Sequence, residues 1–166
     1  PENMVLVVAG NVKHAQVTAA AEQWLGGMPA ATPNAPHPVE ARPGSRRVAV
    51  RQKATEQANI CISFPGLPLA HPDRYALDLV NALLGEGMSS RLFLELREEQ
   101  ALVYDVHSYV SEYSDAGALT IFAACEPQKA RTTAAACLEE TALMLKTLTP
   151  EELQKGIRMS AGRIQL

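Results

Sequence analysis

Two side chains in the middle of the sequence have the types and the spacing that suit acyl-transfer chemistry. Arg97 falls in the last turn of a predicted helix, and Tyr104 begins the next predicted strand seven residues later. A helix that leads directly into a strand can bring the guanidinium and the phenol to one edge of a sheet. Both groups donate hydrogen bonds, and two donors that converge on one oxygen stabilise a tetrahedral oxyanion. The alternative is that Arg97 is a surface residue beside Glu98 and Glu99, and that Tyr104 only packs.

The histidines predict no metal site. His14, His37, His71 and His107 have no His, Cys or acidic residue at a known ligand spacing, and neither H-x-x-E-H nor H-E-x-x-H occurs. His107, which lies in the middle of a predicted strand, is the one weak candidate for a site role. The sequence therefore predicts no metal ligands in this chain.

The glycines and cysteines are interpreted as structural. Gly85-Glu86-Gly87 follows a helix rather than a strand and lacks the Walker lysine, so it predicts a helix end and a tight turn. No G-x-S-x-G elbow is present, and no Cys or Ser has an obvious basic neighbour. Cys61, Cys125 and Cys137 form no CxxC pair and are predicted to be buried thiols. The lack of paired cysteines is compatible with the bacterial cytoplasm and with the periplasm.

Composition narrows the class of protein. With 166 residues, 47% of them apolar, the chain can bury one ordinary core. A formal charge of −3 without a basic tract argues against nucleic-acid binding. The longest apolar run, Met4 to Ala9, is too short to span a bilayer. We expect a single α+β domain over residues 1–166, with a proline-rich surface linker at about 29–43, cut from a longer protein.

Hydrophobic periodicity predicts the elements that would position these groups. Strands are expected at 4–9, around 48–50, at 60–64, at 103–111 and at 119–125, and the strands at 48–50 and 60–64 are expected to form a hairpin. Helices are expected at 12–25, 72–84, from Ser89 or Ser90 to about 97, from Pro127 to about 145, and from a capping box at Thr149–Glu152. The order predicts an α+β fold with a largely antiparallel sheet and helices packed on one face.

The chain resembles the insulinase/pitrilysin-type (inverzincin) zinc peptidases, in the branch of the mitochondrial processing peptidases. GMSSRLF at 87–93 is similar to the family's GGGMSSRLF, and LREEQALVY at 96–104 is similar to LREKRGLAY. NMVLVVAGNV at 3–12, QANICISFP at 57–65, the HPD helix start at 71–73 and the TPEEL helix start at 149–153 also fit in order. The resemblance covers nearly the whole chain and corresponds to the second subdomain, the one without zinc ligands.

The resemblance implies a role for particular residues. In the family, an Arg and a Tyr at the spacing of Arg97 and Tyr104 project into the zinc site of the opposite half, where they hold substrate and stabilise the intermediate. The turn at Gly85 and Gly87 matches a region that handles peptide substrate. Ala101 stands where the family usually has Gly, so the turn there must avoid a positive φ or accept strain.

Two functions follow as expectations. The first is a non-zinc-binding domain of a zinc metallopeptidase, inactive alone, whose partners are a zinc-binding sister domain or second subunit and a peptide substrate, in a homo- or heterodimer. Zinc is then expected in the parent or partner domain only. The alternative is a catalytically inactive structural or partner subunit of the same family, used for assembly and peptide binding.

Overall fold

The computed structural model of the chain describes residues 4–29, 37–39 and 47–164. It contains two compact units, Pro1–Pro38 and Val39–Leu166, which are described separately below. The expectation that residues 1–166 form one domain stays a prediction, and most of the proline-rich linker at 29–43 lies outside the described residues.

The first unit consists of an extended apolar segment followed by helix α1 (His14–Leu25). Gly10, with φ 145°, ends the apolar segment, and the amide of Val12 donates to the carbonyl of Gly10 at 2.9 Å. The prediction of a buried strand at Met4–Ala9 is wrong for this chain. A strand needs a partner to pair its backbone, and no described residue pairs with this segment.

The second unit is built on a three-stranded antiparallel sheet in the order β1-β3-β2. The strands are β1 (Ala58–Pro65), β2 (Val103–Glu112) and β3 (Gly117–Cys125). β2 and β3 form the predicted hairpin, closed by the Tyr113 amide, which donates to the Ala116 carbonyl at 2.8 Å. β1 pairs along its whole length with β3, from Ala58 opposite Cys125 to Pro65 opposite Ala118.

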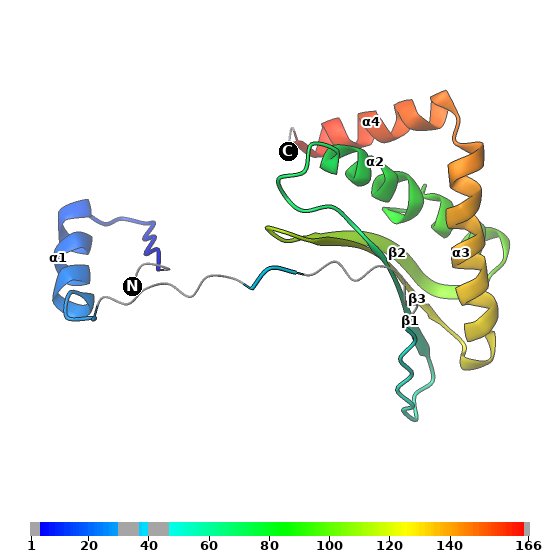
Figure 1. The fold of residues 1–166 in the computed structure, drawn as a ribbon, viewed down its shortest axis with the longest axis horizontal. Coiled ribbons are helices and arrows are strands. Elements are labelled where there is room, and N and C mark those ends of the chain that lie inside the picture. The colour runs from blue at the N-terminus through cyan, green and yellow to red at the C-terminus, as the bar shows by residue number, and fades with distance from the viewer. Residues whose placement is uncertain (1–3, 30–36, 40–46, 165–166) are drawn as a thin grey trace. The chain divides into compact units, whose positions relative to one another are not determined.

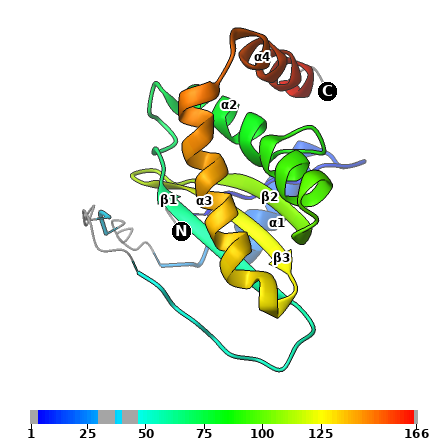
Figure 2. The same cartoon turned by 90° about the vertical axis from the view of Figure 1, so that its right-hand side faces the viewer.

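The helices cover one face of this sheet, as predicted (Figures 1 and 2). They are α2 (Arg74–Gly85), the π-helix η1 (Phe93–Glu99), the short 3₁₀ turn η2 (Pro127–Lys129), α3 (Ala130–Thr147) and α4 (Pro150–Ile164). α2 and α3 lie against the strands, and α4 packs on α2 on the side away from the sheet (Figure 1). The fold is therefore α+β.

The core lies between the sheet and these helices. Alternate strand residues point toward the helices because successive side chains of a strand face opposite ways. The buried apolar residues include Leu84, Leu92, Leu96, Ile121, Ala123, Cys125 and Cys137, and Ile60, Ile62 and Phe64 of β1 pack against them. The opposite face of the sheet carries the intervening residues of each strand, among them Asp105, His107 and Phe122.

Three local predictions are wrong. Val48 and Val50 are exposed and lie in no strand, so the predicted hairpin with β1 is not formed by the described residues. Cys61 is exposed because it lies on the sheet face away from the helices, whereas Cys125 and Cys137 are buried as expected. Neither Ser89 nor Ser90 caps the following helix. The Ser90 hydroxyl instead donates to the Gly87 carbonyl at 2.7 Å and closes the loop before the helix.

Candidate functional site

The turn from η1 to β2 fixes the backbone between the two predicted donors. The Leu102 amide donates to the Leu96 carbonyl at 2.8 Å, and the Gln100 amide donates to the Glu95 carbonyl at 3.0 Å. Between them Ala101 has φ 48°, so the turn accepts the left-handed conformation at a non-glycine residue. Buried Leu96 and Val103 anchor the two ends of the turn in the core.

Arg97 and Tyr104 lie at the two ends of this turn, in the last turn of η1 and at the start of β2, as the sequence predicts. Arg97 is exposed, and its guanidinium carbon lies 4.9 Å from the centre of the Phe93 ring. Tyr104 is 51% exposed and is the extra residue at a register shift between Val103 and Asp105. No hydrogen bond joins either side chain to another described residue, so both donors are available to an outside group.

The sheet face away from the helices carries His107, the one histidine considered for a site role, together with neighbours that the sequence analysis did not connect with it. Nδ1 of His107 lies 3.3 Å from Oδ2 of Asp105, and the imidazole stacks on Phe122 at 5.0 Å between ring centres. Tyr109 lies further along the same strand, 6.1 Å from His107. The available signal was the two-residue spacing of Asp105, His107 and Tyr109, which places all three on one face of a strand.

The two glycines of the predicted substrate loop have different structural roles. Gly85 is buried at the end of α2, where a β-carbon would come within 2.5 Å of the Ser108 amide nitrogen and hydroxyl. Gly87 has φ 81°, a conformation that favours glycine, and open space around it. Close packing and a left-handed turn therefore account for these two glycines, and their contact with substrate stays a prediction.

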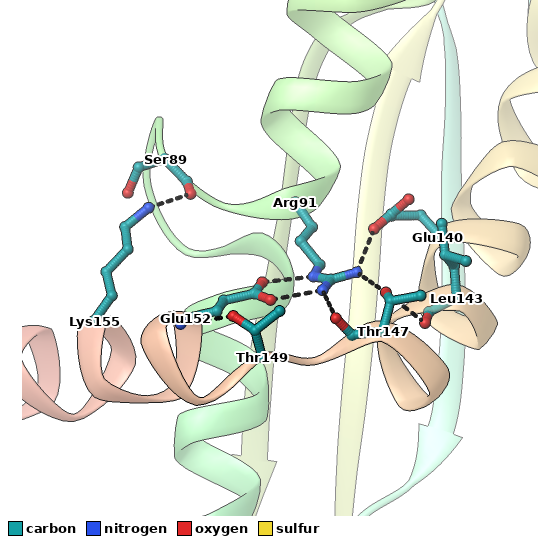
Figure 3. Close-up of polar contacts among 8 residues, drawn as sticks. All are labelled: Ser89, Arg91, Glu140, Leu143, Thr147, Thr149, Glu152 and Lys155. Carbon is teal, nitrogen blue, oxygen red and sulfur yellow. Dashed lines mark hydrogen bonds and ion pairs between the residues drawn. The ribbon is translucent and has the colours of Figure 1, made fainter.

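Arg91 holds a network of hydrogen bonds and ion pairs that the sequence analysis did not predict (Figure 3). Its Nε and Nη2 each donate to Glu152 at 2.6 Å in a bidentate pair, and Nη1 donates to Glu140 at 3.2 Å and to the Thr147 hydroxyl at 3.0 Å. Only 16% of the Arg91 side chain is exposed. These bonds join the helical turn just before η1 to α3 and α4, and the residues that Arg91 contacts lie 49 to 61 residues further along the chain.

The charges in this centre stabilise each other. The hydrogen bonds from Arg91 hold the pKa of the Glu152 carboxyl below its ordinary value, and Glu152 in turn raises the pKa of Arg91. The Glu152 amide donates to the Thr149 hydroxyl at 3.2 Å, which confirms the Thr149 half of the predicted capping box. The Glu152 carboxylate, the other half of that prediction, accepts from Arg91 instead. Lys155 donates to the Ser89 carbonyl at 3.0 Å, so α4 also holds the loop that follows α2 (Figure 3).

The described residues do not fit a metal site or a membrane span. Within residues 4–29, 37–39 and 47–164, no group of three or more His, Cys, Asp or Glu side chains is arranged to hold a metal ion. Nor does any helix in the part of the chain that the structure describes have the length and apolar character needed to cross a bilayer.

The described residues of the second unit therefore form an α+β domain with a three-stranded antiparallel sheet, helices on one face of it, and two exposed donors at the end of η1 and the start of β2. The family model for the peptidase M16 inactive domain matches residues 1–160, and the chain belongs to this family. The resemblance to zinc peptidases is thereby confirmed at the level of the family and of its inactive domain.

Relatives and solved structures agree with this assignment. The chain is 36% identical to an uncharacterized zinc protease of Streptomyces coelicolor and 33% identical to one of Bacillus subtilis, over 98% and 100% of its own length. It is also similar to a peptidase M16 inactive domain from Pseudomonas fluorescens, with 27% identity over 68% of this chain and 28% of that one, and a TM-score of 0.63. A protease from Helicobacter pylori, 23% identical over 93% of this chain and 39% of that one, shares the fold with a TM-score of 0.69.

The chain spans only part of these relatives. It corresponds to 37% of the Streptomyces coelicolor protein and 40% of the Bacillus subtilis protein. The activity and partners of a whole protein of this kind are therefore a matter for proposal.

Proposed function

We propose that this chain is the non-zinc-binding domain of a zinc metallopeptidase, and that it supplies Arg97 and Tyr104 to a zinc site on another domain. The proposal includes the likeness to the mitochondrial-processing-peptidase branch. The observation that carries it is the pair of exposed donors at the two ends of one hydrogen-bonded turn. The described residues do not fit a zinc site, so zinc and its ligands belong to the partner domain in this proposal.

Arg97 and Tyr104 can assist the hydrolysis of a peptide bond without serving as the nucleophile or the general base. The guanidinium of Arg97 is a permanent cation, and the Tyr104 hydroxyl is a neutral donor. Both would lower the energy of the negative charge that develops on the carbonyl oxygen during hydrolysis. Because η1 and β2 are held by Leu96 and Val103 in the core, neither donor needs the backbone to reorganise when substrate arrives.

Substitution in the assembled peptidase tests the catalytic role. In a protein that contains both this chain and its zinc-binding domain, Arg97→Ala should lower kcat/KM for a peptide by about 10²–10³-fold, as the loss of an oxyanion donor does. Tyr104→Phe, which removes only the hydroxyl, should lower it in the same direction. Neither change should alter the melting temperature, since both side chains are exposed.

Two control variants show whether a loss of activity is specific to the site or follows the removal of any exposed arginine or any exposed tyrosine hydroxyl. Arg131→Ala removes an exposed arginine on α3, and Tyr113→Phe removes an exposed hydroxyl between β2 and β3. Both should leave kcat/KM unchanged. If Arg97→Ala behaved like Arg131→Ala in an active assembly, the catalytic role would be wrong. An assembly that binds peptide but never hydrolyses it would support the inactive-partner function instead.

A further inference from the structure

The apolar segment Met4–Ala9 of the first unit pairs with no other strand in the described part of the chain. Its side chains alternate in exposure: Val5 and Val7 are 89% and 81% exposed, whereas Leu6 and Val8 are 59% and 46% exposed. The less exposed set lines a shallow pocket against α1, together with Val12, Val17 and Ala21. The segment thus has one face turned to its own helix and a second apolar face turned to solvent.

The backbone of this segment is also unpaired in the described part of the chain. Its amides and carbonyls form no ladder with any described strand, although β-branched residues dominate it. α1 follows after a tight turn and buries none of its own residues, and Trp24 is 80% exposed. A strand followed by a covering helix is half of a βαβ unit, which requires a further strand alongside the first.

We propose that Met4–Ala9 is a strand of a sheet that belongs to the zinc-binding sister domain. In that sheet α1 covers the face of Leu6 and Val8, and the sister domain covers the face of Val5 and Val7. A run that is apolar on both faces is typical of a strand inside a sheet covered on both sides. The first unit is therefore the interaction surface through which this chain joins its partner.

The sister domain is the occupant that the observations favour. The relatives are zinc proteases by name, and about three fifths of each lies outside the match to this chain. The described residues hold no metal-ligand group, which leaves the zinc ligands of such a protein to that remainder. A second copy of this chain fits less well, because a ribbon of two identical segments leaves Val5 and Val7 of both copies in water.

The sheet of the second unit also fits less well. Its apolar face is already covered by α2, η1 and α3, and its other face carries polar side chains such as Asn59, Asp105 and His107. A strand added to either edge of that sheet would place one of its two apolar faces beside these polar residues. The isolated chain therefore offers no complete burial for the segment.

Hydrogen exchange measured by mass spectrometry tests the proposal without any variant. The amides of residues 5–9 should exchange at the rate of an unprotected chain in this chain alone, and at least about 100-fold more slowly in the protein that also contains the zinc-binding domain. Absence of protection in that longer protein would overturn the proposal. Protection already present in the chain alone would also overturn it: if independent of concentration, it would indicate pairing within the chain, and if dependent on concentration, pairing of two copies.

A substitution tests the exposed face directly. Val7→Asp places a charge on the face turned away from α1 and should weaken association with the zinc-binding domain by at least about tenfold. Val48→Asp makes the same change at a residue of the second unit that is exposed to a similar degree and lies in no strand, and it should have no effect. Equal affinities for the two variants would contradict the proposal. Arg97 and Tyr104 lie in the second unit, so the two proposals can fail separately. Protection of residues 5–9 in the longer protein, together with an unchanged kcat/KM for Arg97→Ala, would support this inference and contradict the proposed function.

Discussion

At the residue scale, Ala101 determines how η1 leads into β2. Its φ of 48° costs an L-amino acid about 1 kcal/mol, and the cost is offset by the hydrogen bond from the Leu102 amide to the Leu96 carbonyl. The sequence resemblance had marked this position as one where glycine is usual. The structure shows that the turn keeps the left-handed conformation and bears the strain.

Replacing Ala101 with glycine should therefore stabilise the second unit. Ala101→Gly should raise the free energy of unfolding by about 0.5–1 kcal/mol, because glycine adopts a positive φ without steric cost. Urea denaturation of the two proteins measures the difference. The matched change Ala118→Gly, in a strand with ordinary backbone, should destabilise instead. A loss of stability with Ala101→Gly would show that the conformation is not strained.

The sequence predicts the positions of Arg97 and Tyr104 better than it predicts Arg91. The first two follow from a local pattern, a helix end and a strand start seven residues apart. The partners of Arg91 come from α3 and α4, up to 61 residues away, and no local pattern brings them together. Arg91 was part of a quoted motif, but its network becomes visible only once the helices are packed.

At the scale of the elements, the Arg91–Glu152 pair fastens α4 to the rest of the second unit. Glu152→Gln should lower the free energy of unfolding by about 1–3 kcal/mol at neutral pH, the range for hydrogen bonds to charged groups. Since the pKa of Glu152 is lower in the folded protein than in the unfolded chain, its contribution is present above about pH 5 and is lost as the pH falls through the lowered pKa.

Denaturation curves at several pH values measure this difference. The gap between the native protein and Glu152→Gln should narrow steadily below about pH 5. Glu151→Gln, on the same turn of α4 but exposed, should show little gap at any pH. A gap that stays constant into the acid range would mean that the charge of Glu152 contributes nothing.

Gly85 sets how closely α2 approaches β2. Gly85→Ala should destabilise the second unit by about 1–3 kcal/mol, because the added methyl meets the backbone and side chain of Ser108. Gly162→Ala, in α4 with open space around it, should be neutral or stabilising by up to about 1 kcal/mol. Thermal melts of both variants check the contrast. If Gly85→Ala melted like Gly162→Ala, close packing would not be the reason for glycine at position 85.

The strands show where periodicity is informative. β1, β2 and β3 were predicted because each alternates in a way that matches one covered face. The segments at 4–9 and 48–50 are also rich in valine, yet neither is a strand here. Propensity reports how well a side chain fits a sheet, and a strand also needs a neighbour to pair with.

At the scale of the whole molecule, the proposed function requires a second, zinc-binding domain. If that proposal is right, the chain alone should neither bind zinc tightly nor hydrolyse peptides, the zinc-binding domain should bind zinc by itself, and peptide hydrolysis should appear only when the two are mixed. Zinc analysis and a peptide-cleavage assay of each part and of the mixture measure this. The inactive-partner function predicts instead that the mixture binds peptide without cleaving it.

The strand order β1-β3-β2 also bears on how the protein is made. β1 leaves the ribosome more than 50 residues before β3, its only neighbour in the described sheet. Until then Ile60, Ile62 and Phe64 have no sheet to join, and Arg91 waits in the same way for Glu152 at the far end of the second unit. During synthesis an apolar strand is therefore exposed until β3 has been made, so the second unit should complete its fold only after α4 has left the ribosome.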